Sequence, residues 1–147
     1  MGTQNRRFPR VSTIDDFEDY RAEEQRSIDT SKSTEERRRF GQFATPNELA
    51  KDIIRDGLAL FGSSSAISFL EPAAGTGSFL SALIAEAPES IESAIAFEID
   101  SKYGSVAKEL WGEFVDIRIS DFTRADTASR HVNLLVTNPP YVRHHYI

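Results

Sequence analysis

The sequence predicts an α/β domain built on an open, doubly wound sheet of parallel strands, and three observations carry this prediction. Short apolar segments alternate with segments of helical periodicity from residue 41 onward. A glycine-rich turn, Glu71 to Gly77, directly follows the first apolar segment. The polar residues that could carry chemistry all follow predicted strands, which is the edge where open α/β sheets bind ligands.

The composition indicates a globular protein that could work in a reducing compartment. The chain has 147 residues, of which 39% are hydrophobic, so it is long enough for one domain with a core. It contains no cysteine, which excludes disulfides and thiolate metal sites. No apolar run is long enough for a secretory signal or a membrane span. We therefore expect a soluble, cytoplasmic protein with no membrane partner.

The charge is unevenly distributed along the chain. The net charge is -6, yet residues 1–40 carry nine basic and nine acidic side chains, so the excess of acid lies in the rest. A surface that wraps DNA is normally basic, so the part from Gly41 onward is not by itself a convincing nucleic-acid binder. The cluster Arg37 to Arg39 can be either a solvated helix face or a phosphate contact.

Residues 1–40 are predicted to form a charged, partly helical extension, and residues 41–147 a partial domain. Apolar residues mark one short helix around residues 14–20, and a second helix is expected at residues 35–40. Thr45-Pro46-Asn47-Glu48 resembles a capping box with proline in the first helical position. The helix that it opens has an apolar face of Ala50, Ile53, Ile54, Leu58 and Phe61.

Four strands and two further helices follow in alternation. Strands are expected at residues 66–70, 93–99, 114–119 and 132–137. One helix begins near Ser78 and is stopped by Pro88, and another begins after Asp100, which we interpret as its N-cap. This order implies parallel βαβ units.

The glycine turn is suited to a nucleoside cofactor without phosphate groups. Gly75 and Gly77 allow a sharp turn and a close approach of a ligand to the backbone. A dinucleotide fingerprint needs a third glycine three residues later, and that position is Leu80. Glu71 would repel a phosphate but can hold an ammonium group. The alternative is a purely structural strand-to-helix turn.

Acidic residues follow the second and third predicted strands. The Glu98 carboxylate can accept both hydroxyls of a ribose. Asp121 can accept a hydrogen bond from an adenine amino group, and Phe122 can pack on the base. Taken alone, Asp121 and Phe122 are equally typical of a turn followed by a core phenylalanine.

Asn138-Pro139-Pro140-Tyr141 is the most specific motif, and it follows the fourth predicted strand. The two prolines fix an extended, rigid edge with acceptors and few donors. The Asn138 side-chain oxygen and the Pro139 carbonyl can each accept one hydrogen of an amino group, which localises the nitrogen lone pair. Tyr141 can stack on the planar group that carries the amine. The motif therefore predicts chemistry on an exocyclic amino group.

With these motifs in order, the chain resembles the N-terminal part of adenine-N6 DNA methyltransferases of restriction–modification systems, in the gamma arrangement. Residues 41–46 look like the element that precedes the glycine loop in that arrangement, and residues 69–79 look like the loop itself. The resemblance covers roughly residues 40–147. It implies a Rossmann-like S-adenosylmethionine-dependent methyltransferase fold, incomplete, with its first four strands.

The resemblance also assigns roles to individual residues. Asn138, Pro139, Pro140 and Tyr141 would form the catalytic motif that holds a flipped adenine. The residues expected to bind S-adenosylmethionine are Thr45, Glu71, Ala73, Gly75, Gly77, Glu98, Ile99, Asp121 and Phe122. Double-stranded DNA would be the partner, because the target base must leave the duplex to react.

Family members continue through further strands and a target-recognition domain. We therefore expect this chain to be a fragment, a truncated gene product or one piece of a split enzyme, inactive on DNA alone. The fourth strand would be an exposed edge, where a complementing chain can pair.

Two alternatives use the same residues. Enzymes that methylate a protein glutamine or an RNA guanine also use Asn-Pro-Pro-Tyr, and a non-catalytic remnant would retain the same fold. No metal site is expected, because His144 and His145 are adjacent rather than spaced along one helical face.

Overall fold

The computed structural model describes residues 13–39, 42–62, 65–126 and 131–141. Gly41, the first residue of the predicted 41–46 element, and the adjacent histidines His144 and His145 lie outside these ranges. Within them, no helix combines the length and the apolar character needed to cross a membrane.

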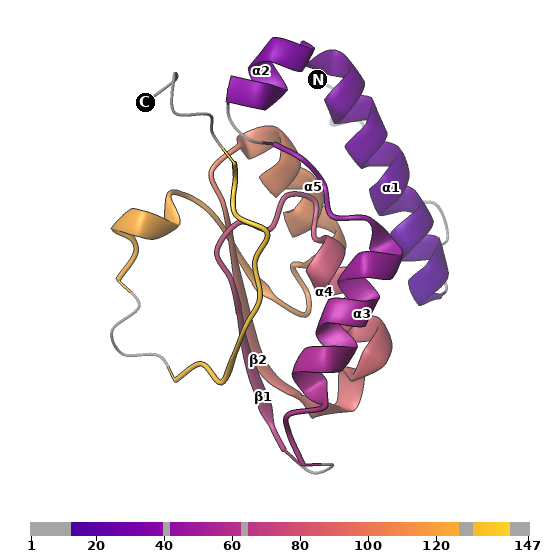
Figure 1. Cartoon of the computed structure of the whole chain (residues 1–147), viewed down its shortest axis with the longest axis vertical. Helices are drawn as coiled ribbons and strands as arrows, with labels where there is room; N and C mark the ends of the chain where they lie inside the picture. The colour runs from indigo at the N-terminus through magenta and orange to yellow at the C-terminus, as the bar shows by residue number, and fades with distance from the viewer. Residues whose placement is uncertain (1–12, 40–41, 63–64, 127–130, 142–147) are drawn as a thin grey trace, which may run out of the picture.

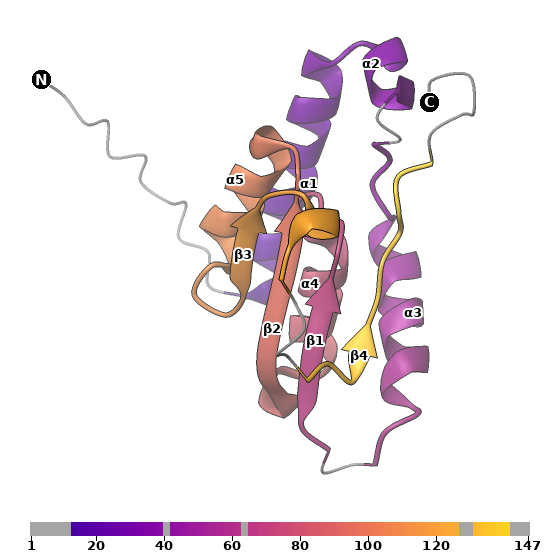
Figure 2. The ribbon, with the colours of Figure 1, turned by 90° about the vertical axis from the view of Figure 1, so that its left-hand side faces the viewer.

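Four parallel strands form one sheet, as the sequence predicted (Figure 2). The order across the sheet is β3-β2-β1-β4, so the chain moves outward from β1 to β3 and then returns to the other side of β1. This reversal places a topological switch point between β1 and β4. The strands are β1 (Ile67–Glu71), β2 (Ile91–Glu98), β3 (Asp116–Ile119) and β4 (Leu134–Leu135).

The long helices of the described chain all cover one face of the sheet (Figures 1 and 2). They are α1 (Ile14–Ser31), α3 (Asn47–Leu58), α4 (Ser78–Glu86) and α5 (Ser101–Trp111). Two right-handed crossovers in the same direction place α4 and α5 on the same side. The return from β3 to β4 runs in the opposite direction, and its one-turn helix η2 (Phe122–Arg124) packs on the other face. Among the described elements, η2 is therefore the only helix that covers the second face of the sheet.

The core lies between the sheet and the helices. Its fully buried side chains include Phe69 from β1, Leu80 and Leu83 from α4, Ile54 from α3 and Trp111 from α5. A smaller cluster on the opposite face holds Leu70, Ile95 and Phe97, with Phe122 packed against it. The central strands are thus apolar on both faces, which is why they read as continuous hydrophobic segments.

The first helix is longer than the sequence predicted. It begins after Thr13, whose side chain and that of Asp16 form a reciprocal capping box, and it continues for 18 residues. The helix packs against α4 and α5, and the Phe17 ring lies 5.7 Å from that of Trp111. Its polar residues misled the prediction, because Arg21 and Gln25 are buried rather than solvated. A short helix α2 (Thr34–Arg39) follows.

The capping box predicted at Thr45 is wrong. The helix α3 begins at Asn47 after Pro46, and no side chain caps it. The hydroxyl of Thr45 instead accepts a hydrogen bond from Asn138, which lies 93 residues further along the chain. Asp100, in contrast, caps α5 as predicted, because its side chain accepts a hydrogen bond from the backbone of Lys102.

The remaining element boundaries differ by a few residues. The strand β2 begins at Ile91 and is preceded by a 3-10 turn, η1 (Pro88–Ser90). The ladder of β4 is only two residues long, although the backbone of Asn133 and Val136 adds a bond to β1 at each end.

Candidate functional site

A pocket of about 390 Å³ opens at the carboxyl ends of β1 and β4, at the switch point of the sheet. The glycine turn, the ends of β2 and β3, and the segment 42–45 form its other walls. Two of the predicted site residues, Gly77 and Tyr141, do not line it. The predicted residues that do line it are Thr45, Glu71, Ala73, Gly75, Glu98, Ile99, Asp121, Phe122, Asn138, Pro139 and Pro140.

The two glycines of the turn have different neighbours. Both have a positive φ, +58° at Gly75 and +97° at Gly77. A Cβ on Gly75 would meet no atom within 4 Å, so this glycine exposes its backbone to the pocket. A Cβ on Gly77 would lie 2.4 Å from Nε1 of Trp111. Gly77 is thus required by packing behind the turn, whereas Gly75 leaves room for a ligand.

Glu98 ties the end of β2 to the glycine turn. Its Oε2 accepts a hydrogen bond of 2.7 Å from the backbone N–H of Gly75, and its Oε1 accepts one of 2.8 Å from that of Asp100. Burial raises the pKa of the Glu98 carboxyl, and these two backbone bonds oppose the rise. Each carboxylate oxygen retains a second lone pair, so Glu98 can still accept bonds from a diol.

Glu71 is a buried acidic residue at the end of β1 that lines the pocket. Its side chain is only 1% exposed, and its Oε2 has no hydrogen-bond partner among the described residues. Burial and the nearby Glu98 raise the pKa of the Glu71 carboxyl well above its ordinary value, while Arg21 acts in the opposite direction. A buried acceptor without a partner is costly, so this oxygen is suited to a cationic ligand group.

The wall of the pocket that follows β3 is formed by Asp121 and η2. Asp121 uses one oxygen to accept bonds from the backbone N–H and the hydroxyl of Thr123, at 2.9 and 2.7 Å, and these bonds lower the pKa of Asp121. The Phe122 ring packs edge-on against Phe97, with centroids 5.2 Å apart. Ile99, which is 69% exposed, adds apolar surface to the same pocket. Together they offer an acceptor and a flat apolar surface.

The tetrapeptide forms the wall that follows β4. The Asn138 amide donates a hydrogen bond of 3.2 Å from Nδ2 to the hydroxyl of Thr45. This bond directs the NH2 group toward Thr45 and leaves Oδ1 as an acceptor. Pro139 and Pro140 line the pocket, while Tyr141 is 69% exposed. The arrangement can accept hydrogen bonds from a planar amino group entering from outside.

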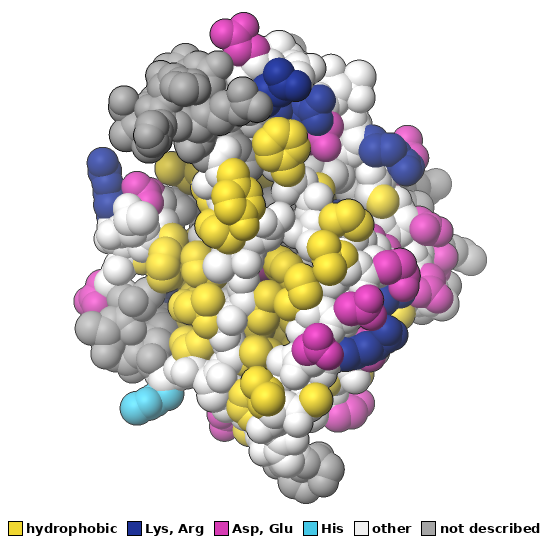
Figure 3. Space-filling model, viewed as in Figure 1, with side chains coloured by type: hydrophobic (Ala, Val, Ile, Leu, Met, Phe, Trp, Pro, Cys, Tyr) yellow, Lys and Arg dark blue, Asp and Glu magenta, His cyan; other side chains and the backbone are white. Residues whose placement is uncertain are grey.

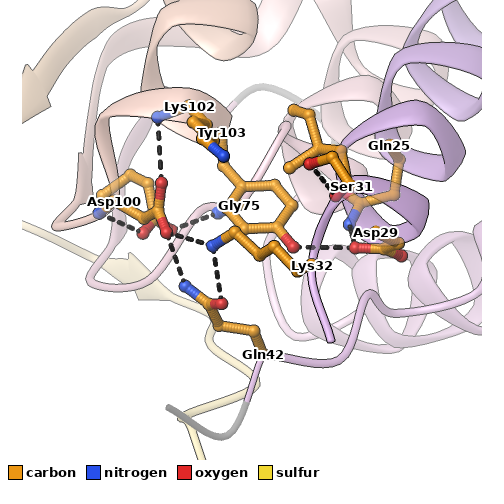
Figure 4. Close-up of polar contacts among 11 residues, drawn as sticks. Gln25, Asp29, Ser31, Lys32, Gln42, Gly75, Asp100, Lys102 and Tyr103 are labelled. Carbon is orange, nitrogen blue, oxygen red and sulfur yellow. Dashed lines mark hydrogen bonds and ion pairs between the residues drawn. The ribbon is translucent and has the colours of Figure 1, made fainter. Parts of the chain in front are cut away.

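Several pocket-lining residues were not predicted as site residues, and Gln25, Gln42 and Tyr103 are among them. Gln25 comes from α1, Gln42 from the segment before α3, and Tyr103 from α5 (Figure 4). Tyr103 belongs to the helix predicted after Asp100 and Gln25 to the charged extension of residues 1–40, and neither was given a role in the site. Both bond to Asp29 of α1, an arrangement that depends on the packing of α1 on α5 and that local sequence patterns do not reveal.

The chain is similar in sequence to a curated protein and in fold to several solved structures. No family model matches the chain. The type II methyltransferase M.AccI of Acinetobacter calcoaceticus is 32% identical over 124 residues, which are 82% of this chain and 22% of that protein. The chain therefore spans about a fifth of the length of the curated relative that it matches.

Two solved structures share the fold. A candidate class I S-adenosylmethionine-dependent methyltransferase from Listeria monocytogenes superposes with a TM-score of 0.70 and 14% identity, covering 88% of this chain and 40% of that one. A candidate RNA methyltransferase from Pyrococcus horikoshii gives a TM-score of 0.54 and 25% identity, covering 67% and 48%.

The fold is thus that of class I S-adenosylmethionine-dependent methyltransferases, with four parallel strands and an N-terminal helix. In sequence, 82% of the chain is similar to the type II methyltransferase M.AccI.

Proposed function

We propose that this chain provides the S-adenosylmethionine pocket and the amino-group site of a DNA methyltransferase that modifies adenine at N6. The observation that carries the proposal is the Asn138–Thr45 hydrogen bond, which fixes an acceptor edge beside a pocket that contains Glu71 and Glu98. The similarity to M.AccI supports a DNA substrate.

The residues of the pocket fit the cofactor. The unpartnered oxygen of Glu71 would receive the ammonium of the methionine part. Glu98 would accept the ribose hydroxyls, and Asp121 and Phe122 would hold the adenine ring. Gly75 and Ala73 would lie against the cofactor with their backbone. When bound, the sulfonium group supplies an electrophilic methyl group.

The tetrapeptide would prepare the target amine. Asn138 Oδ1 and the Pro139 carbonyl would each accept one N–H of the adenine amino group, so that its lone pair is localised on nitrogen. Tyr141 would stack on the base after it has left the duplex. No strong base is needed, because the proton leaves after the nitrogen has gained the methyl group. Thr45 would contribute by holding the Asn138 amide in the required orientation.

Methylation of an RNA base or of a protein glutamine is the second candidate function. The likeness to the candidate RNA methyltransferase of Pyrococcus horikoshii, at 25% identity, favours RNA among these two. The amino groups of adenine, guanine and glutamine present the same two hydrogens to Asn138 and Pro139. A non-catalytic remnant is the remaining possibility.

Calorimetry with S-adenosylmethionine tests the cofactor part of the proposal. We expect wild-type protein to bind and Glu98→Ala to bind about 10- to 100-fold more weakly, since hydrogen bonds to a charged group are lost. Glu109→Ala removes an exposed carboxylate of α5 and is the control, expected to bind normally. Absence of binding by the wild type would favour a remnant.

Transfer of a labelled methyl group tests the acceptor. Adenine-containing DNA, RNA and a glutamine peptide are each offered to the chain, alone and together with a complementing chain of the kind expected to pair along β4. N6-methyladenine in DNA, lost in Asn138→Ala, is the product expected when both chains are present. Labelled RNA or peptide without labelled DNA would overturn the adenine assignment.

A further inference from the structure

Lys32, the residue that follows α1, is a buried cation beside the pocket (Figure 4). Its side chain is 3% exposed. The ammonium contacts Asp100 Oδ2, donates a 2.8 Å hydrogen bond to Oε1 of Gln42, and lies 4.6 Å from the centre of the Tyr103 ring. Gln42 in turn donates a 2.8 Å bond to the same oxygen of Asp100. Lys32, Gln42 and Asp100 thus each contact the other two, and we call these three side chains the Lys32 cluster.

The Lys32 cluster joins two walls of the pocket. On one side, the backbone N–H of Asp100 donates to Glu98, and Glu98 also accepts the N–H of Gly75. On the other side, Gln42 begins the segment that ends at Thr45, the partner of Asn138. Hydrogen bonds and a short stretch of chain thus connect Lys32 both to the carboxylate proposed for the ribose and to the amino-group site.

Acidic groups outnumber cations around the Lys32 cluster. Glu98 and Asp100 face each other from the end of β2, and Glu71 approaches Glu98 from β1. On the helical side, Asp29 of α1 accepts a 2.7 Å bond from the Tyr103 hydroxyl. The cations acting on these groups besides Lys32 are Arg21 on Glu71 and Arg37 on Tyr103, while Lys102 contributes its backbone N–H to Asp100.

Asp100 is the acidic group next to Glu98 that Lys32 contacts. Burial raises the pKa of Asp100, but the bonds from Lys32, Gln42 and the Lys102 backbone, together with the charge of Lys32, lower it below its ordinary value. The negative charge of Asp100 raises the pKa of Glu98. When the ammonium is removed, Gln42 and the Lys102 backbone still bond to Asp100 and favour its charged form, which then acts on Glu98 without a neighbouring positive charge.

We propose that Lys32 is a positioning residue for the cofactor, which holds Asp100 and Gln42 together and keeps Glu98 able to accept the ribose hydroxyls. The inference rests on the proposed function, because it assigns Glu98 to the ribose. Lys32 does not touch the reacting atoms; it acts through Asp100 and Gln42.

The test is the pH dependence of S-adenosylmethionine affinity, measured by calorimetry between about pH 5.5 and 8.5. In the wild type, affinity falls as the pH drops and Glu71 and Glu98 gain protons, and the part due to Glu98 is the part that Lys32 and Asp100 should move. In Lys32→Met we expect binding about 10-fold weaker than in the wild type at neutral pH. The loss of affinity on acidification should also begin at a higher pH, because the pKa of Glu98 is raised further. Lys32→Arg restores much of the affinity, and Lys108→Met, at an exposed position of α5, leaves it unchanged.

A second variant keeps the test valid if Lys32→Met does not fold. Asp100→Asn retains an N-cap for α5 but removes the charge beside Glu98, so the fall in affinity should move to lower pH. In the double variant with Lys32→Met and Asp100→Asn, the pH profile of affinity should return toward that of the wild type. A merely structural role for Lys32 would lower affinity without moving the pH profile.

The outcomes separate the two proposals. If the wild type does not bind S-adenosylmethionine, the proposed function fails. If the wild type binds, and Lys32→Met or Asp100→Asn binds with the same pH profile, only the role of Lys32 is overturned.

Discussion

At the scale of single residues, the contacts of a pocket residue cannot be predicted from the residues next to it in the sequence. Gly75 and Gly77 are two residues apart in one turn, yet only Gly75 faces the pocket. Thr45 looked like a helix cap and is instead the partner of Asn138. In both cases a local pattern indicated the special residue but not the group that it contacts.

Substituting the two glycines separately should distinguish their roles. Gly77→Ala places a Cβ 2.4 Å from Trp111 at a positive φ, so we expect a loss of about 3 kcal/mol in the free energy of unfolding. Gly75→Ala has strain but no clash, and we expect a loss of about 1 kcal/mol with weakened cofactor binding. Urea unfolding followed by circular dichroism measures the free energy of unfolding of each variant. Equal losses would contradict the packing role of Gly77.

At the scale of elements, periodicity predicted the helices that pack on the sheet. The apolar face of α3 was expected from its spacing, and Ala50 and Ile54 are fully buried there, but Ile53 is exposed and Phe61 lies beyond the end of the helix. The 18-residue length of α1 was not predicted, because two of its buried residues, Arg21 and Gln25, are polar and bond to the glycine turn. The hydroxyl of Thr76 bonds to both Arg21 and Gln25, and no local pattern reveals such pairs.

Neighbouring isoleucines of α3 provide a test of how that helix packs. Ile54 is 0% exposed, so Ile54→Ala should lower the free energy of unfolding by about 3 kcal/mol through lost burial and a cavity. Ile53 is 37% exposed, and Ile53→Ala should cost about 1 kcal/mol or less. The two variants share one helix and one chemical change, so a similar cost for both would show that α3 packs in another orientation.

At the scale of the whole molecule, the sequence predicted the parallel sheet and the alignment of its motifs along one edge. It did not predict how little covers the second face, because that depends on the direction of each crossover. The edge position of β4 is confirmed: among the described strands it pairs only with β1. Figure 3 shows hydrophobic side chains gathered over the β4 segment and the adjoining side of α3. Exposed members in these elements are Leu49, Ile53 and Leu135.

This edge should make the chain prone to self-association. Leu135 is 53% exposed, and Leu135→Lys places a charge on the edge strand. We expect sedimentation velocity to show association only at higher protein concentration, with a change of less than about 0.5 kcal/mol in the free energy of unfolding. Leu60→Lys, at an 87% exposed position beyond α3, is the control. Unchanged association in Leu135→Lys would mean that another surface is responsible.

The contact between Trp111 and the glycine turn has an optical consequence. Trp111 is the single tryptophan of the chain, and its indole N–H donates a 2.9 Å hydrogen bond to the carbonyl of Thr76. The indole is 1% exposed, and Phe17 lies against it from α1. Its fluorescence therefore originates from one place, where the turn that faces the pocket and the first helix meet. The chain carries its own spectroscopic probe of that junction, without any added label.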